Sequence, residues 1–304
     1  MTPTGAALQH AYAACQALAE AHYENFPVAS RLMPARLRPH VAAIYAFART
    51  ADDFADEPGR EPEERLRLLD EWGRRLDGVP VKERPPVKEC LPGKECSPDM
   101  IFSALADTRE RFDLPAELFH DLLSAFKQDV VTTRYASWHD LLDYCRRSAN
   151  PVGRLVLRLS GYRDAELDRA SDAVCTALQL TNFWQDLAID WPRGRLYVPQ
   201  DVWRAAGADP AALDRGRMTP EWTAAMRVCG QYTRRLFAEG RPVCDGVSGR
   251  LRYELRATWL GGSRILDRLE AVDFDVVTSR PALRTSDAIV IACGTALWRR
   301  QSPP

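Results

Sequence analysis

Aspartate side chains gather in two short segments of this chain, about 130 residues apart. The first segment, RTADDFADE, carries Asp52, Asp53 and Asp56, and the second, NFWQDLAIDWPRGRLYVP, carries Asp186 and Asp190. In each segment one aspartate pair is spaced i, i+4 within a helical pattern, so the two carboxylates share one helical face. Like charges at that spacing repel by roughly 0.2–0.5 kcal/mol per pair, which predicts a positive group between them.

A hard divalent cation is the simplest positive group for such a place. Magnesium prefers one or two carboxylates together with the phosphate oxygens of a substrate to a cage made only of protein. The two aspartate motifs therefore indicate an enzyme that acts on a diphosphate.

The first motif also allows a plainer interpretation, in which a solvated helix end carries an ion pair between Arg49 and Asp53. The residues just before it, VAAIYAFAR, are too apolar for an exposed helix. An acidic patch that continues a buried helix is typical of a pocket wall with carboxylates at its mouth.

The second motif extends into a stripe of four oxygen-bearing side chains, Gln179, Asn182, Asp186 and Asp190. The stripe could face solvent, but the same helix is apolar over most of its circumference. The apolar residues are Leu178, Leu180, Phe183, Trp184, Leu187 and Ile189. They predict a central helix, and a buried anionic stripe without a cation is costly. Two such stripes together favour metal binding.

Two further segments lie near the second motif. PRGRLYVP supplies Arg193, Arg195 and Tyr197, whose arginines could clamp a diphosphate or could be ordinary loop residues. YCRRSANPVG places small residues around Pro151, which allows either a close approach of substrate to the backbone or a simple helix kink.

Apolar residues recur at helical spacing along almost the whole chain, and no series of alternating β-branched residues suggests a sheet. The pattern predicts helices over roughly 4–22, 36–56, 61–77, 99–111, 115–127, 137–149, 151–160, 164–189, 200–205, 210–214, 219–244, 249–271 and 281–299. No boundary signal divides residues 1–304, so we expect one all-α domain. The proline- and lysine-rich stretch 78–98 predicts a flexible surface loop.

Composition excludes several classes of function. Lysine plus arginine number 41 against 42 aspartate plus glutamate, so the balance of charge argues against a nucleic-acid partner. The sequence contains no phosphate-binding Gly-Lys loop, dinucleotide fingerprint or nucleophile elbow, and its five histidines do not fall at zinc spacing. Scattered cysteines and the lack of a leader or long apolar run predict a cytoplasmic protein that does not cross a membrane.

The two aspartate motifs, with GRLYVP after the second and YCRRSANPVG between them, resemble the squalene/phytoene synthase family of head-to-head prenyl transferases. The similarity runs from about His22 to Glu270. It implies an all-α isoprenoid-synthase-type bundle, in which both motifs face a central cavity and hold magnesium on a prenyl diphosphate.

The resemblance also implies roles for individual residues. Magnesium ligands would be Asp52, Asp56, Asn182, Asp186 and Asp190. The catalytic residues would be Asp52, Asp56, Asp186, Asp190 and Tyr144, and the substrate-binding residues Arg49, Asp53, Gln179, Asn182, Arg195, Tyr197 and His22.

Within that family, the segments around both motifs are most similar to the hydroxysqualene synthases of bacterial hopanoid pathways. That similarity implies ionisation of presqualene diphosphate and capture of the cation by water, giving hydroxysqualene and diphosphate. Condensation of two farnesyl diphosphates to presqualene diphosphate or squalene remains an alternative within the family. A non-catalytic relative that acts as a scaffold or assembly protein is the alternative from another class.

Because prenyl substrates are hydrophobic, the protein is also expected to be able to contact the inner face of a membrane and other enzymes of the pathway. The last expected helix mixes an apolar run with terminal arginines, which suits a peripheral membrane contact or an ordinary core helix.

Overall fold

The computed structural model describes residues 5–21, 33–56, 59–78, 96–278 and 280–299. The helices within these ranges are α1 (Gly5–Ala21), η2 (Ala35–Leu37), α2 (Arg38–Asp56), α3 (Pro62–Leu76), α4 (Pro98–Phe112), α5 (Ala116–Val131), α6 (Trp138–Ser148), α7 (Asn150–Leu159), α8 (Ala165–Asp190), η3 (Trp191–Arg193), α9 (Gln200–Ala205), α10 (Pro210–Asp214), α11 (Pro220–Gly240), α12 (Val243–Gly246), α13 (Gly249–Ala271) and α14 (Thr285–Ala296). No strand occurs among the described residues, where an isolated bridge joins Arg134 and Leu196. The all-α expectation is confirmed.

Local signals explain where several of these helices begin. The Asp164 carboxylate caps α8 by accepting hydrogen bonds from the backbone N–H groups of Glu166 at 2.7 Å and Leu167 at 3.0 Å. Ser137 and Asp140 form a capping box at the start of α6. Such caps satisfy N–H groups that have no partner within the helix, and each typically contributes about 1 kcal/mol.

Several helix boundaries differ from those expected. The helix predicted over 219–244 ends at Gly240 and restarts as α12, because Pro242 has no N–H to continue the hydrogen-bond ladder. The last helix begins at Thr285 rather than Pro281, and α5 continues to Val131. Residues 79–95 of the expected loop lie outside the described residues.

Contacts divide the chain into two compact units. Unit 1 comprises Met1–Val131 and Arg154–Arg163, and unit 2 comprises Thr132–Gly153 and Asp164–Pro304, so the division passes through α7. The expectation of a single domain stays a prediction.

Unit 1 is built around α2, which contacts α1, α3, α4 and α5. The fully buried Phe47 of α2 lies 5.9 Å from Trp72 and 5.5 Å from Phe119, measured between ring centroids. The Trp72 indole donates a hydrogen bond to the Phe47 carbonyl at 3.3 Å, so the large ring is buried with its polar atom satisfied. This aromatic core holds the helix that ends in the first aspartate motif.

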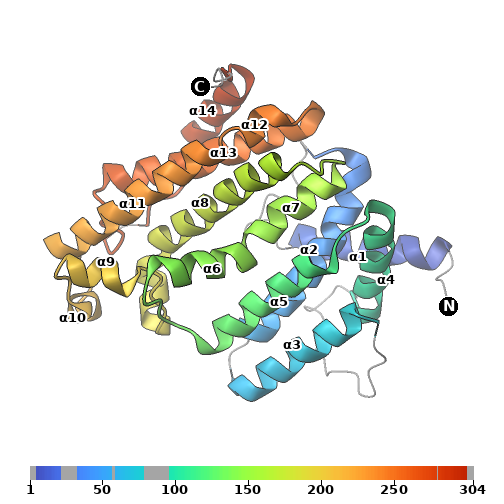
Figure 1. Ribbon diagram of the computed structural model, residues 1–304, viewed down its shortest axis with the longest axis horizontal. Coiled ribbons are helices and arrows are strands. Elements are labelled where there is room, and N and C mark those ends of the chain that lie inside the picture. Colours follow the sequence, from blue (N-terminus) through green and yellow to red (C-terminus); the bar gives the residue numbers. More distant parts are fainter. Residues whose placement is uncertain (1–4, 22–32, 57–58, 79–95, 279, 300–304) are drawn as a thin grey trace. The chain divides into compact units, whose positions relative to one another are not determined.

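Unit 2 contains α8, which carries the second motif, and α11 and α13 run alongside it (Figure 1). The approach of α11 is close because Gly240 has no side chain. A Cβ there would lie 2.5 Å from the Val174 Cγ2 atom and 2.8 Å from the Ala170 carbonyl oxygen, both on α8. Among the described residues, no helix is long and apolar enough to serve as a membrane span.

Candidate active site

The first aspartate motif forms the last turn of α2. Arg49 lies one turn earlier, and its guanidinium contacts Asp52 at 3.4 Å and Asp53 at 2.6 Å. The Asp52 side chain is 38% exposed and the Asp53 side chain 51%, while Asp56 is also exposed. The predicted ion pair between Arg49 and Asp53 is therefore present, and the carboxylates lie where a solvated ligand can reach them.

The apolar stretch before this motif is buried as expected. Ala43, Ala46, Phe47 and Ala51 are 0% exposed. Phe54, between the aspartates in sequence, is also buried and meets Trp72 edge to face at 5.4 Å. The acidic patch thus continues a helix that is embedded in the core of unit 1, while the carboxylates at its end are accessible to solvent.

The second motif lies along the final turns of α8. Asn182 is exposed, whereas Gln179, Asp186 and Asp190 are half-buried. The apolar side chains Leu180, Phe183, Trp184 and Leu187 are buried. Ile189 differs from the expectation, because it is 43% exposed. The oxygen stripe therefore runs along the border between the buried and the accessible side of α8.

Arg280 is a charged partner of this motif that the sequence did not indicate. Its Nε atom lies 2.5 Å from the Asp186 Oδ1 atom. The next residue, Pro281, accepts a hydrogen bond from the buried Gln185 amide through its carbonyl. No spacing rule could link Arg280 to Asp186, since 94 residues separate them.

Aromatic rings cover the same end of α8. The rings of Phe183 and Tyr197 stack in parallel with centroids 3.6 Å apart. Tyr144, a predicted catalytic residue, lies 6.2 Å from Phe183 and 6.3 Å from Tyr197. Tyr135 is a further member that sequence reasoning missed, 5.7 Å from Tyr197 and 5.5 Å from Tyr144. Stacked π faces beside an acidic stripe are suited to a carbocation.

Backbone pairing explains how Tyr197 reaches this position. The Leu196 N–H donates to the Thr133 carbonyl at 3.0 Å, and the Gln200 N–H donates to the Tyr135 carbonyl at 2.9 Å. The segment after the second motif is therefore held against residues 132–136, which brings Tyr135 and Tyr197 together.

The predicted arginines after α8, Arg193 and Arg195, flank a sharp reversal of the chain at Gly194. Gly194 has a φ of 79°, a value that glycine adopts without steric penalty. The Arg195 N–H then donates to the Asp190 carbonyl at 3.0 Å, which keeps Arg195 close to the end of the motif helix. The Arg134 guanidinium lies 4.8 Å from the centroid of the Trp191 ring. Burial lowers the pKa of the Arg134 guanidinium.

The segment YCRRSANPVG packs against α8. A Cβ on Gly153 would lie 2.3 Å from the Ser171 Oγ atom and 2.6 Å from the Cys175 Sγ atom. The Asn150 side-chain oxygen accepts a hydrogen bond from the Thr176 hydroxyl at 2.9 Å. These residues therefore serve helix packing, and the chain breaks between α6 and α7 at Ala149.

The donor set suits magnesium in its chemistry. Carboxylate and amide oxygens are hard ligands, and each motif already holds an arginine guanidinium against its carboxylates, which shows that each accepts a counter-charge. Within the described ranges, however, no three His, Cys, Asp or Glu side chains form a group ready to hold a metal ion. His22 lies outside the described residues.

The family model named squalene/phytoene synthase matches residues 19–287, a range that contains both motifs and the aromatic rings around the second. The chain belongs to the squalene/phytoene synthase family. The resemblance of the two motifs to that family is thereby confirmed.

Curated relatives agree with this assignment. The chain is 38% identical over 195 residues to a hydroxysqualene synthase of Zymomonas mobilis, covering 63% of this chain and 60% of the relative. It is 32% identical over 275 residues to a hydroxysqualene synthase of Rhodopseudomonas palustris, covering 89% of this chain and 87% of the relative. The match to phytoene synthase 3 of Zea mays, at 30% identity, covers 91% of this chain and 63% of the plant protein.

Solved structures confirm the expected type of helical fold. Squalene synthase HpnC from Alicyclobacillus acidocaldarius matches with a TM-score of 0.77 and 34% identity, covering 89% of this chain and 97% of that one. A dehydrosqualene synthase solved with a ligand matches with a TM-score of 0.76 at 19% identity, which supports the fold alone. The isoprenoid-synthase-type architecture is therefore established for this chain.

Proposed function

We propose that the protein is an enzyme that converts presqualene diphosphate to hydroxysqualene, with release of diphosphate and with magnesium as cofactor. The hydroxysqualene synthases among its relatives support this substrate and product. The observation that carries the proposal is the end of α8, where the oxygen stripe of Asn182, Asp186 and Asp190 adjoins the stacked rings of Phe183 and Tyr197. Such a place combines groups for a charged diphosphate with groups for an apolar cation.

The diphosphate end of the substrate is assigned to the charged side chains. Asp52 and Asp56 of the first motif, on α2, and Asn182, Asp186 and Asp190 of the second motif, on α8, would each serve as magnesium ligands. Bound magnesium would neutralise the departing diphosphate. Arg195 and Arg280 would bind phosphate oxygens through charge-assisted hydrogen bonds, and Arg280 would exchange Asp186 for phosphate when substrate arrives.

The apolar end of the substrate is assigned to the aromatic rings. Tyr144, Tyr197 and Phe183 present π faces, which stabilise a cation without forming a bond to it. Tyr144 is 5% exposed, so its ring is shielded from bulk water, and such shielding would limit the access of water to a cation held there. Gln179, one turn before Asn182 on α8, would orient the substrate.

Condensation of two farnesyl diphosphates is the second candidate, because relatives named phytoene synthase match 90% or more of the chain. The scaffold alternative is disfavoured because both aspartate motifs are intact. A cytoplasmic location and association with pathway enzymes stay predictions.

A product assay tests the proposal. Purified protein receives either presqualene diphosphate or farnesyl diphosphate, each with magnesium and with or without NADPH, and products are identified by mass spectrometry. We expect hydroxysqualene from presqualene diphosphate without a reductant. Presqualene diphosphate formed from farnesyl diphosphate would instead establish the condensation, and no product from either would contradict both.

A further inference from the structure

The C-terminal helix α14 has an exposure pattern that is the reverse of an ordinary surface helix. Thr285 and Ser286 in its first turn are exposed and polar, but every exposed residue from Ala288 to the end of the helix is apolar, and so is Leu297 directly after it; the larger group is Ile289, Val290, Ala292, Cys293, Ala296 and Leu297. Ile289 is 65% exposed, Val290 52% and Leu297 77%. Its buried residues, Asp287 and Thr295, are polar. A surface helix normally turns its polar side chains to water, so this outer face has the character of a contact surface.

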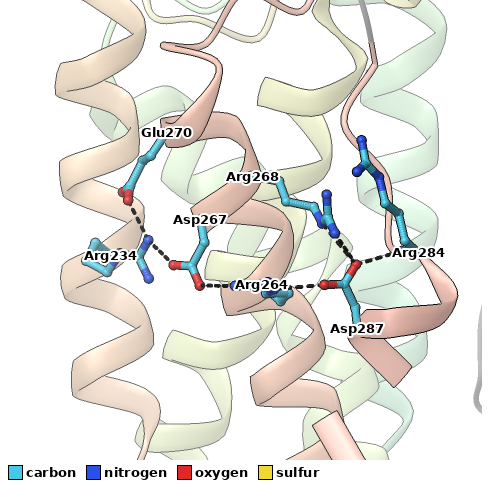
Figure 2. Close-up of polar contacts among 7 residues, drawn as sticks. All are labelled: Arg234, Arg264, Asp267, Arg268, Glu270, Arg284 and Asp287. Atoms are coloured by element: carbon cyan, nitrogen blue, oxygen red, sulfur yellow. Dashed lines mark hydrogen bonds and ion pairs between the residues drawn. The ribbon is translucent and has the colours of Figure 1, made fainter. Parts of the chain in front are cut away.

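A buried carboxylate holds the start of α14 against α13 (Figure 2). Asp287 is 0% exposed and accepts hydrogen bonds from Arg264 at 2.9 Å and from Arg268 at 2.6 Å. The backbone N–H of Arg284 donates to the same carboxylate at 2.6 Å. This backbone hydrogen bond first, and then Arg264, lower the pKa of Asp287 to about 2, so the carboxylate stays charged.

The same network reaches a third helix. Arg264 lies 3.9 Å from Asp267, and Arg234 of α11 contacts both Asp267 at 2.7 Å and Glu270 at 2.8 Å. Figure 2 shows these side chains as one continuous series from Glu270 to Asp287. The first turn of α14 is thus fixed through α13 to α11.

The C-terminal end of α14 is held by contacts of the Trp298 ring. The Trp298 indole, just beyond α14, donates to the Asp245 carboxylate at 3.1 Å. The guanidinium of Arg241 lies 4.3 Å from the centroid of the Trp298 ring, and that of Arg256 lies 5.3 Å from it. The Trp259 ring meets Trp298 edge to face at 5.5 Å. Because α14 is held at both ends, its apolar face is kept turned outward.

Charge around this face favours an anionic partner. From Leu283 to Arg300 the sequence contains one acidic residue, the buried Asp287. Arg284 precedes the helix and Arg299 follows it, and both are exposed. If two copies of the chain paired through α14, these arginines would meet arginines in either a parallel or an antiparallel arrangement. Self-association is therefore opposed by like charge, whereas a surface of anionic lipid complements both ends.

We propose that the outer face of α14, defined by Ile289, Val290, Ala292, Cys293, Ala296 and Leu297, docks on a membrane surface that contains anionic lipids. The apolar side chains enter the boundary between headgroups and acyl chains, and Arg284 and Arg299 contact lipid phosphates. A helix of 12 residues lies in this interface rather than spanning it. The inference is independent of the proposed function, since lipid binding is measured without substrate.

Flotation of the purified full chain with vesicles tests this inference. Vesicles of phosphatidylcholine alone are compared with vesicles that also contain phosphatidylglycerol. We expect the wild type to bind the anionic vesicles, and Ile289→Ser with Leu297→Ser to weaken binding about tenfold or more. Val131→Ser is the matched control, because Val131 is also 65% exposed but belongs to α5. Circular dichroism checks that each variant is folded.

The charged ends are tested separately. Arg284→Gln and Arg299→Gln should each weaken binding to anionic vesicles about fivefold, whereas Arg217→Gln, a change at an exposed arginine outside this surface, should not. Absence of wild-type binding would overturn the proposal, and so would equal binding by the double serine variant and Val131→Ser. A dimer in light scattering that the serine changes dissociate, without lipid binding, would assign the face to a second copy and overturn it as well.

Discussion

The two aspartate motifs share a spacing but obtain their counter-charges differently. Asp52 and Asp53 meet Arg49, which lies on the same helix within one turn. Asp186 meets Arg280, which is 94 residues away. The first ion pair follows from helical geometry alone, whereas the second exists only because the chain returns to α8. A short-range charge partner can thus be inferred from spacing, and a long-range one cannot.

The units that carry the motifs also differ in how their helices are joined. In unit 1 a polar network links α1, α2 and α4, with the Tyr12 hydroxyl 3.0 Å from the His40 Nδ1 atom and 2.6 Å from Asp107. In unit 2 the contact of α11 with α8 depends on the missing side chain of Gly240. We therefore expect unit 1 to respond to pH and unit 2 to added volume.

The largest effect is expected from the aspartates themselves. Asp52→Asn and Asp186→Asn should each lower kcat by about 10²–10³, the usual loss when one preorganised charge at a reacting centre is removed. Steady-state kinetics with magnesium measure this loss. Asp168→Asn, on α8 outside the motif, is the matched control and should keep its turnover. A large loss at only one motif would show that the two do not share one function.

The arginine partners of the two motifs, Arg49 and Arg280, can be tested in the same way. If Arg280 binds a substrate phosphate as proposed, Arg280→Gln removes that charge-assisted hydrogen bond and should lower kcat/KM about tenfold, mostly through KM. Arg49→Gln should have a similar effect if the local partner also serves the substrate. An unchanged KM in Arg280→Gln would indicate that its contact with Asp186 is structural.

Added volume tests the packing of unit 2. Gly240→Ala should lower the free energy of unfolding by about 1–3 kcal/mol, because the new Cβ meets backbone atoms of α8 that cannot move aside. Urea denaturation measures the change. Gly261→Ala is the control, since the nearest atom to its added Cβ is 3.9 Å away and alanine favours a helix. Equal stability of the two variants would contradict the packing argument.

The smallest effect concerns pH and unit 1. Burial, and then the charge of Arg111, lower the pKa of His40 below 6.5, against the opposing effect of Asp107. Since the unfolded chain binds this proton more readily, His40 contributes stability above pH 6.5 that is lost as pH falls toward its lower folded pKa. Thermal unfolding between about pH 5 and 8 measures this slope. His40→Gln should flatten it, and an unchanged slope would assign it to other groups.

Much of the fold was predictable because the signals are local. Helical periodicity placed α2 and α8 correctly, and the proline and glycine breaks located most of the ends. The larger errors fell at Pro242, where a short helix follows the break, at Thr285, where α14 starts four residues later than expected, and at Val131, to which α5 continues. Each depends on which backbone groups find partners.

The candidate site was predictable only in part. The acidic residues and Tyr197 stand in recognisable motifs, so their types and spacing singled them out as candidates, and their roles stay predictions. Tyr135 and Arg280 were missed because no motif contains them, and they reach the end of α8 through contacts distant in sequence. Aromatic and arginine residues are common in this chain, which makes a single one uninformative without its neighbours.

The sequence by itself determined the helical class, the two aspartate motifs and the family, because each depends on residue types at short, regular intervals. Only the tertiary structure decided that Arg280 meets Asp186, that Tyr135 joins the rings around Tyr197 and that α14 turns its apolar face outward. These arrangements depend on packing between distant segments, where the free energy comes from burial and complementary charge rather than from local conformational preference.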